Sequence, residues 1–230
     1  MGSQLNLNLG HRFTLSREDY YISSANSLAI RALDDWTARN ETGFIIVGPK
    51  SSGKTHLASV WRNETGAEAL KVDEVSSLNF ASLAKEKFLV IENLNILSSF
   101  SKNEKKKVEE KILHLYNFFA ASGSKILITA TTPPRNWNIQ IADLLSRLMA
   151  LQITELSLPD DNLLAAIMAK QFADRQILVS TEVIGHATVR MERSFWFADK
   201  LVKALDSESM SIKKPISKKL VNHVINKLVS

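Results

Sequence analysis

A glycine-bounded segment between an apolar run and a helix-like run constrains the fold of this chain most strongly. Phe44–Val47 is continuously apolar, and Gly48–Thr55 follows it with the pattern G-x-x-x-x-G-K-T. In a strand–loop–helix context this pattern is typical of a phosphate-binding loop, whose backbone N–H groups surround phosphates at a helix N-terminus. The sequence therefore predicts a nucleotide site made of Gly48, Pro49, Lys50, Ser51, Ser52, Gly53, Lys54, Thr55 and the adjacent His56.

Side chains at the end of this loop and of a later strand predict a magnesium nucleotide as the ligand. Lys54 is suited to neutralise terminal phosphate charge, and the Thr55 hydroxyl is suited to bind Mg²⁺. Enzymes with such a loop also need an acid at the end of another strand, and the apolar run Phe88–Ile91 leads into Glu92. We therefore expect ADP or ATP with Mg²⁺ near Thr55 and Glu92, the alternative for Glu92 being an ordinary strand-end acid.

The residue after this acid bears on catalysis. Asn93 stands where a base or water-polarising acid is expected, and an amide can hydrogen-bond a water molecule but not take its proton. The pattern predicts a site that binds nucleotide better than it hydrolyses it, with weak intrinsic turnover.

Short β-rich runs alternate with helical stretches from Phe44 to Leu156, which predicts an α/β domain with a parallel sheet and helices on both faces. After Pro159-Asp160-Asp161, a helix-start signal, apolar residues recur at helical spacing, which predicts an all-helical second part. The domain boundary is expected near Ser157. The five candidate strands are Phe44–Val47, Ala69–Val72, Phe88–Ile91, Lys125–Thr129 and Leu151–Ile153.

Composition excludes several classes of protein. The chain has no cysteine, which argues against disulfides and thiolate chemistry, and its five scattered histidines show no close metal-ligand pairing. No apolar run approaches the ~20 residues of a membrane span, which argues against membrane insertion. The N-terminus lacks a secretory pattern, so a cytoplasmic location is expected. The net charge of +5 is mild. The basic runs Lys105–Lys107 and Lys213–Lys227 are interpreted as solvated helix faces, the second with a weak phosphate-facing edge as its alternative.

These motifs resemble the AAA+ nucleotide-binding proteins of the DnaA branch, and more closely the short DnaA homologues of the Hda type. The resemblance covers nearly the whole chain. It implies a P-loop AAA+ domain with a five-stranded parallel sheet over residues 13–157 and a smaller helical lid over residues 158–230. Residues 1–12 would be a clamp-binding peptide, in which Gln4, Leu5, Leu7 and Leu9 resemble the motif that docks into the replication sliding clamp. A short edge strand or packed arm is the alternative.

The resemblance also assigns roles to individual residues. Tyr21 and Ile22 fall in the segment that covers the adenine, with a place in the core as their alternative. Thr131 occupies the sensor-one position, where the initiator carries an Asp, and a structural strand end is its alternative. Arg147 resembles the arginine finger that acts on a neighbour's γ-phosphate, although an ion pair with Asp143 is the simpler alternative.

In the lid, Arg190 is aligned with the sensor-two arginine that reaches the nucleotide phosphates, and Arg193 is its alternative. Phe195–Phe197, beside them, is interpreted as lid core rather than a platform for base stacking.

The resemblance implies a regulator that stimulates ATP hydrolysis on the initiator DnaA while tethered to the DNA-loaded clamp. DNA would then be contacted through the clamp, and self-association stays open. Two alternatives remain: a helicase-loader-like ATPase that grips single-stranded DNA, and a nucleotide-locked clamp adaptor without stimulatory activity.

Overall fold

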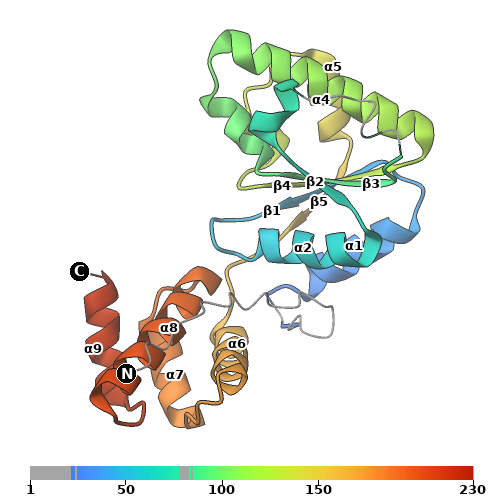
Figure 1. The fold of residues 1–230 in the computed structure, drawn as a ribbon. Coiled ribbons are helices and arrows are strands. Elements are labelled where there is room, and N and C mark those ends of the chain that lie inside the picture. Colours follow the sequence, from blue (N-terminus) through green and yellow to red (C-terminus); the bar gives the residue numbers. More distant parts are fainter. Residues whose placement is uncertain (1–21, 24, 78–82, 84, 230) are drawn as a thin grey trace, which may run out of the picture.

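A five-stranded parallel sheet forms the centre of the α/β part of the chain (Figure 1). The structure is a computed structural model, and it describes residues 22–23, 25–77, 83 and 85–229. The strands lie in the order β2-β3-β4-β1-β5, and all neighbouring pairs are parallel. Their bounds are β1 Gly43–Val47, β2 Glu68–Lys71, β3 Phe88–Glu92, β4 Lys125–Ala130 and β5 Gln152–Glu155. The predicted fold class and all five predicted strands are confirmed, with ends shifted by one or two residues.

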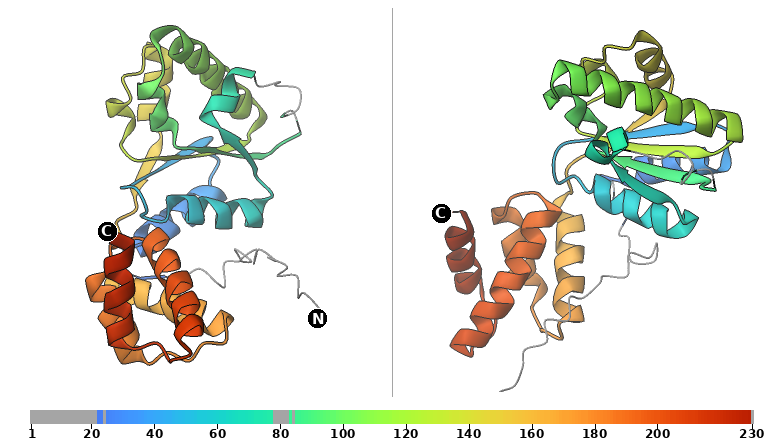
Figure 2. Two further views of the ribbon diagram at one scale, coloured as in Figure 1. Left: turned by 60° about the vertical axis from the view of Figure 1, so that its left-hand side comes forward. Right: turned by 45° about the horizontal axis from the view of Figure 1, so that its top comes forward.

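Helices cover both faces of the sheet, and a separate group of helices follows it (Figures 1 and 2). Two helices, α1 and α2, cover one face, and α4 and α5 cover the other. The bounds in the α/β part are α1 Ser27–Ala38, α2 Lys54–Thr65, α4 Lys102–Ser122 and α5 Ala142–Met149, with short 3₁₀ helices η2 Val72–Ser77, η3 Leu94–Ser99 and η4 Pro134–Asn136. The following group, called the lid here, contains α6 Asp161–Asp174, α7 Thr181–Arg190, α8 Phe195–Ile212 and α9 Lys218–Val229.

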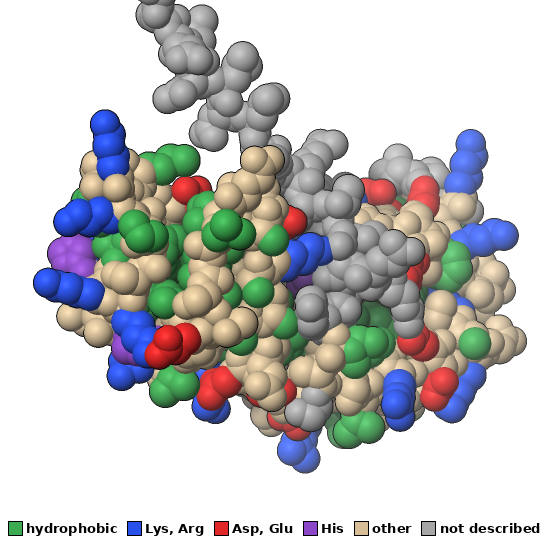
Figure 3. Space-filling view, turned by 90° about the horizontal axis from the view of Figure 1, so that it is seen from below, with side chains coloured by type: hydrophobic (Ala, Val, Ile, Leu, Met, Phe, Trp, Pro, Cys, Tyr) green, Lys and Arg blue, Asp and Glu red, His purple; other side chains and the backbone are tan. Residues whose placement is uncertain are grey.

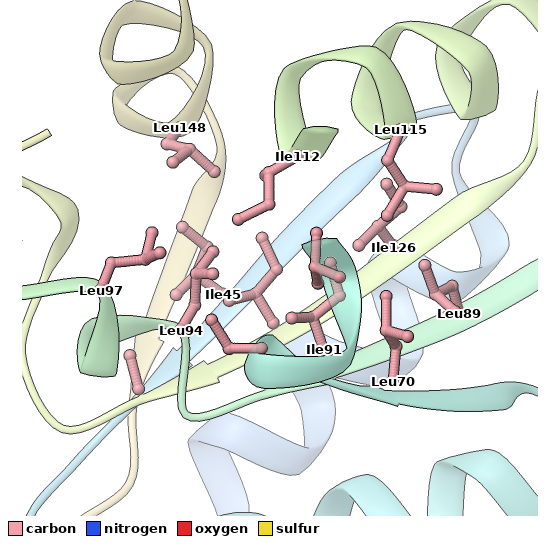
Figure 4. Packing of buried hydrophobic residues seen from close by; sticks show 14 of the residues in the cluster. Ile45, Leu70, Leu89, Ile91, Leu94, Leu97, Ile112, Leu115, Ile126 and Leu148 are labelled. Atoms are coloured by element: carbon pink, nitrogen blue, oxygen red, sulfur yellow. The ribbon is translucent and has the colours of Figure 1, made fainter. Parts of the chain in front are cut away.

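The continuous apolar strands are explained by burial on both faces of the sheet. In β1, Phe44 and Ile46 belong to the core beneath α1 and α2, whereas Ile45 and Val47 belong to the core beneath α4 and α5. Figure 4 shows Ile45 facing the apolar side chains of α4 and α5. Successive strand residues point to opposite faces, so every position of β1 must be apolar.

The helix boundaries follow local capping chemistry. Ser101 and Glu104 form a reciprocal capping box at the start of α4, and Gly123 ends it in a left-handed conformation. At the start of α6, the Asp160 carboxylate accepts a hydrogen bond from the Leu163 N–H at 2.7 Å, which confirms the predicted helix-start signal.

Two interpretations of the sequence are wrong in part. Lys105 is buried rather than solvated, together with Glu109 one turn later. In the run Phe195–Phe197, only Phe197 is a buried lid-core residue, and Trp196 is 59% exposed. Both errors arise because helical periodicity predicts which residues share a face but not what packs on that face. Among the helices that the structure describes, none combines the length and apolar character needed to cross a bilayer.

Leu115 of α4 tests the core over this sheet. Its side chain is fully buried in the cluster between α4 and the strands (Figure 4), so Leu115→Ala is expected to lower the free energy of unfolding by about 2–5 kcal/mol. Urea denaturation of the two proteins measures the change. Leu178→Ala is the matched control because that side chain is 97% exposed, and an equal loss in both variants would contradict the assigned core.

Candidate nucleotide-binding site

Two glycines allow the loop after β1 to form. A Cβ at Gly48 would lie 2.2 Å from the Leu156 carbonyl oxygen, so no side chain fits there. Gly53 has a φ of +94°, and a Cβ on it would lie 2.6 Å from the Phe195 ring. The first glycine therefore permits close packing on the chain leaving β5, and the second permits both the turn and the approach of the lid.

Lys54, the first residue of α2, is held inside this loop. Its side chain is buried, and its ammonium donates to the carbonyl oxygens of Gly48 at 2.8 Å and Pro49 at 2.7 Å. Burial lowers the pKa of Lys54 from its ordinary value. The loop thus positions one cation at a helix N-terminus, where the helix dipole also favours negative charge.

Thr55 and Glu92 meet at the end of β3. The Thr55 hydroxyl donates to Glu92 Oε2 at 3.0 Å, although the two residues come from α2 and β3. Within the described ranges, no three His, Cys, Asp or Glu side chains form a metal site of their own. Mg²⁺ commonly binds through one or two carboxylates together with substrate phosphates and water. The hydroxyl–carboxylate pair therefore fits Mg²⁺ that arrives with a nucleotide.

Polar residues at the ends of β3 and β4 complete this side of the site. Asn93 has a φ of +56°, and its backbone N–H donates to Thr129 Oγ1 at 3.1 Å. The Thr131 N–H donates to Asn95 Oδ1 at 2.8 Å. Asn93, Asn95 and Thr131 all line the cleft described next. The sequence analysis did not identify Asn95, since its role depends on the turn after Asn93.

A cleft of about 1110 Å³ lies between these strand ends and the lid. One wall is the phosphate-binding loop with the ends of β3 and β4, and the other is formed by α6 and α8. The side chains that the lid contributes include Lys170 and Asp174 of α6 and Phe195, Trp196, Asp199 and Lys203 of α8. The cleft is large enough for a nucleotide, since ligand sites commonly measure about 300–1,000 Å³.

The cleft carries more positive than negative side chains. Lys50 and Lys54 on the loop side face the same space as Lys170 and Lys203 on the lid side, and the acids among its lining residues are Asp174 and Asp199. Lys203 pairs with Asp199 at 2.6 Å. The two lid lysines were missed from sequence because no motif marks them.

His56, two residues after Lys54, also lines the cleft. Its pKa is lowered from the ordinary value, first by burial and then by the charge of Lys170, and both effects favour the neutral ring.

Several predicted site residues lie elsewhere. Arg190 is at the end of α7, where its guanidinium donates to the His186 carbonyl at 3.4 Å, and Arg193 donates to Asp161 at 3.2 Å. Neither arginine is among the cleft-lining residues, because the chain turns between α7 and α8 and presents α8 instead. Ile22 lines a small hollow against α1 and α2.

Arg147 lies on α5, on the far side of the sheet from α2. Its Nε donates to Asp143 Oδ1 at 3.1 Å, so the ion pair that was the alternative for Arg147 is present within the helix. The predicted clamp-binding residues Gln4, Leu5, Leu7 and Leu9, and also Tyr21, lie outside the described residues.

Comparison with known proteins supports this fold. Domain III of the replication initiation protein DnaA from Thermotoga maritima is similar, with a TM-score of 0.76, 18% identity and coverage of 93% of this chain and 96% of that one. DnaA bound to AMPPCP and single-stranded DNA has a TM-score of 0.68 and 16% identity, with coverage of 90% of this chain and 69% of that one. A RuvB variant from T. maritima has a TM-score of 0.67 and 19% identity, with coverage of 88% of this chain and 66% of that one. No family model and no curated protein matches the sequence.

These likenesses show that the chain has the P-loop AAA+ fold of DnaA and RuvB. It spans about two thirds of the longer DnaA and RuvB chains. The bound AMPPCP and single-stranded DNA belong to that DnaA structure.

Lys54→Ala tests the loop as a phosphate site. Removing a charge-assisted contact is expected to weaken ADP and ATP binding by about 10- to 100-fold without unfolding the chain. Calorimetric titration measures the affinity, and circular dichroism monitors folding. Lys106→Ala, an exposed lysine of α4, is the control. Unchanged affinity in Lys54→Ala would show that nucleotides do not bind at this loop.

Proposed function

We propose that this chain is a DnaA-related regulator that holds ADP or ATP in its own cleft and supplies Arg147 to ATP bound by the initiator DnaA. Hydrolysis in the initiator would leave it ADP-bound and inactive, which restrains the start of replication. The observation that carries the proposal is the position of Arg147 on α5, which covers the face of the sheet opposite to α2, the helix that follows the phosphate loop. Arg147 does not line the cleft of its own chain. Its proposed target is therefore a nucleotide bound by a neighbouring subunit.

The chain's own cleft is proposed to bind nucleotide with little turnover. Asn93 and Thr131 contribute an amide and a hydroxyl where a carboxylate could otherwise activate water. Mg²⁺, when bound with the nucleotide between Thr55 and Glu92, would neutralise phosphate charge. Lys54 and the backbone N–H groups of the loop would hold and orient the phosphates.

Arg147 has the chemistry that a trans-acting role requires. Its guanidinium is always charged and is 38% exposed, because Asp143 engages only one edge of it. The Tyr116 ring lies 5.7 Å from its Cζ, which supports the side chain from α4. Exposed ion pairs of this type contribute little stability, so exchanging Asp143 for a phosphate on a partner costs little.

A lid lysine is proposed in place of the lid arginine. Lys170 lines the cleft and is close enough to His56, beside the phosphate loop, for its charge to lower the pKa of that ring. Arg190 and Arg193 are engaged outside the cleft. We infer that Lys170 contacts the nucleotide phosphates from the lid.

The proposal also includes a tether between this chain and the sliding clamp. Residues Gln4–Leu9 would bind the sliding clamp as an extended peptide, placing Arg147 near initiators on the same DNA.

The single-stranded DNA alternative is less supported by the lid surface. Lys218 pairs with Glu182, and Lys227 pairs with Glu208 at 3.5 Å. On the face shown in Figure 3, basic side chains are spread around the outline and interspersed with acidic ones.

Lys170→Ala and Arg190→Ala, compared side by side, test the lid contact. Lys170→Ala is expected to weaken ADP binding by about 10-fold, the low end for hydrogen bonds to charged groups, and Arg190→Ala to leave it unchanged. Titration calorimetry gives both affinities, with Lys219→Ala on the outer surface of α9 as control. The reverse pattern would restore Arg190 as the lid cation.

Arg147→Ala tests the proposed function itself. The variant is expected to keep nucleotide affinity but to lose stimulation of DnaA ATP hydrolysis by about 10³-fold, the lower range for an arginine finger. The assay measures phosphate release by DnaA with DNA-loaded clamp, and omission of the clamp should also abolish stimulation. Arg31→Ala, an exposed arginine of α1, is the control. Full stimulation by Arg147→Ala would eliminate the trans-acting mechanism.

A further inference from the structure

The face of α4 toward α5 carries two buried charged side chains that the nucleotide site does not use. Glu109 is fully buried and Lys105 is 5% exposed, which is rare for these residue types unless they are well partnered. They are one helical turn apart, so both side chains lie on the same face of α4. Their partners are backbone groups of the segment that leads from β4 into α5.

Glu109 caps the start of α5 from another helix. Its two carboxylate oxygens accept from the Gln140 N–H at 3.1 and 2.9 Å, and one also accepts from the Ile141 N–H at 2.9 Å. Ile141 is the N-cap residue of α5, so the N–H groups that Glu109 binds belong to the two residues just before the first turn. A carboxylate also suits the positive end of the helix dipole. Glu109 therefore fixes where α5 begins.

Lys105 holds the preceding stretch of the same segment. Its ammonium donates to the carbonyl oxygens of Trp137 at 2.8 Å and Asn138 at 2.6 Å. Trp137 is itself fully buried, and its indole N–H donates to the Thr132 carbonyl at 2.8 Å. The connection from the end of β4 to the start of α5 is thus fixed at successive points by one face of α4.

The same face of α4 reaches the arginine itself. Ile112 of α4 and Leu148 of α5 are buried in one cluster, and Figure 4 shows both directed toward the strands of the sheet. One turn beyond Ile112, the Tyr116 ring lies beside the Arg147 guanidinium. Since α5 has only eight residues, a shift of its first turn moves Arg147 in its second.

We propose that Lys105 and Glu109 are positioning residues that set the orientation of Arg147, an inference that rests on the proposed function. They act through the backbone: Lys105 fixes the connection, Glu109 fixes the two residues that lead into α5, and Arg147 is presented at a defined angle to the neighbouring subunit. Misplacing a catalytic group by about 1 Å can cost on the order of 100-fold in rate.

The test uses Glu109→Gln and Lys105→Met in the full chain, each with a matched control on the exposed side of α4. The controls are Glu110→Gln and Lys106→Met. Glu109→Gln keeps the shape but loses the charge and one acceptor, and it is expected to lower the maximal rate of DnaA ATP hydrolysis by about 10- to 100-fold. The amount of protein for half-maximal stimulation and the affinity for ADP should stay unchanged, as should all values for the controls.

A double-mutant cycle separates positioning from general destabilisation. In an Arg147→Ala background, Glu109→Gln is expected to have no further effect on stimulation, because both changes remove one function. A further loss in that background, a parallel loss of ADP affinity, or full stimulation by folded Glu109→Gln would overturn the proposal. If Glu109→Gln does not fold, Lys105→Met answers the same question with the carboxylate cap intact.

NMR distinguishes failure of this inference from failure of the proposed function. In Glu109→Gln, amide exchange at Gln140 and Ile141 should accelerate and the Arg147 Nε–H resonance should shift. Neither change should occur in the control variants. If the wild-type chain does not stimulate DnaA, the proposed function fails, and these signals alone decide the positioning role. An unchanged Arg147 resonance with accelerated amide exchange would show that Glu109 caps α5 without orienting the arginine.

Discussion

The backbone junction at Gly48 is the constraint on which the rest of the structure depends. The Gly48 N–H donates to the Ala130 carbonyl at the end of β4, and the Leu156 N–H donates to the Val47 carbonyl after β5. The ends of the three neighbouring strands β4, β1 and β5 therefore meet where the phosphate loop begins. The absence of a Cβ on Gly48 makes this approach sterically possible. From Leu156 the chain continues directly into the lid, so the same junction places the lid over the loop.

Buried lysines fix two loops of the structure in the same way. Lys54 donates to the consecutive carbonyls of Gly48 and Pro49, and Lys105 donates to those of Trp137 and Asn138. A loop carbonyl removed from water needs a donor, and an ammonium with three N–H groups can satisfy two at once. One lysine lies in the nucleotide cleft and the other in the connection to α5. The first can exchange its carbonyls for phosphates, whereas the second is enclosed by protein.

The sequence was sufficient for the sheet and the phosphate loop because their signals are local. Doubly buried parallel strands such as Phe88–Ile91 are continuously apolar, and the loop pattern fixes glycine, lysine and threonine at set spacing. Contacts made by a helix face with a distant loop leave no such signal. Lys105 and Glu109 have the i, i+4 spacing of an exposed ion-pair stripe, and only the packing of residues 137–141 against α4 buries them. The lid lysines escaped prediction for the same reason, since Lys170 has no motif.

The lid contact explains why a site with weak hydrolysis would still bind nucleotide. Phe195 packs against Gly53 in the loop, and Lys170 faces the loop across the cleft, so the α/β part and the lid both contact the space a nucleotide would fill. A ligand that binds both walls stabilises their arrangement by its own binding free energy. Hydrolysis would leave ADP in the cleft, where it keeps all contacts except those of the γ-phosphate, so turnover would add nothing to this stabilisation. The proposed catalytic contribution of this chain is Arg147, which is held on the face of the sheet opposite to α2. For that role, holding a nucleotide is more useful than hydrolysing it.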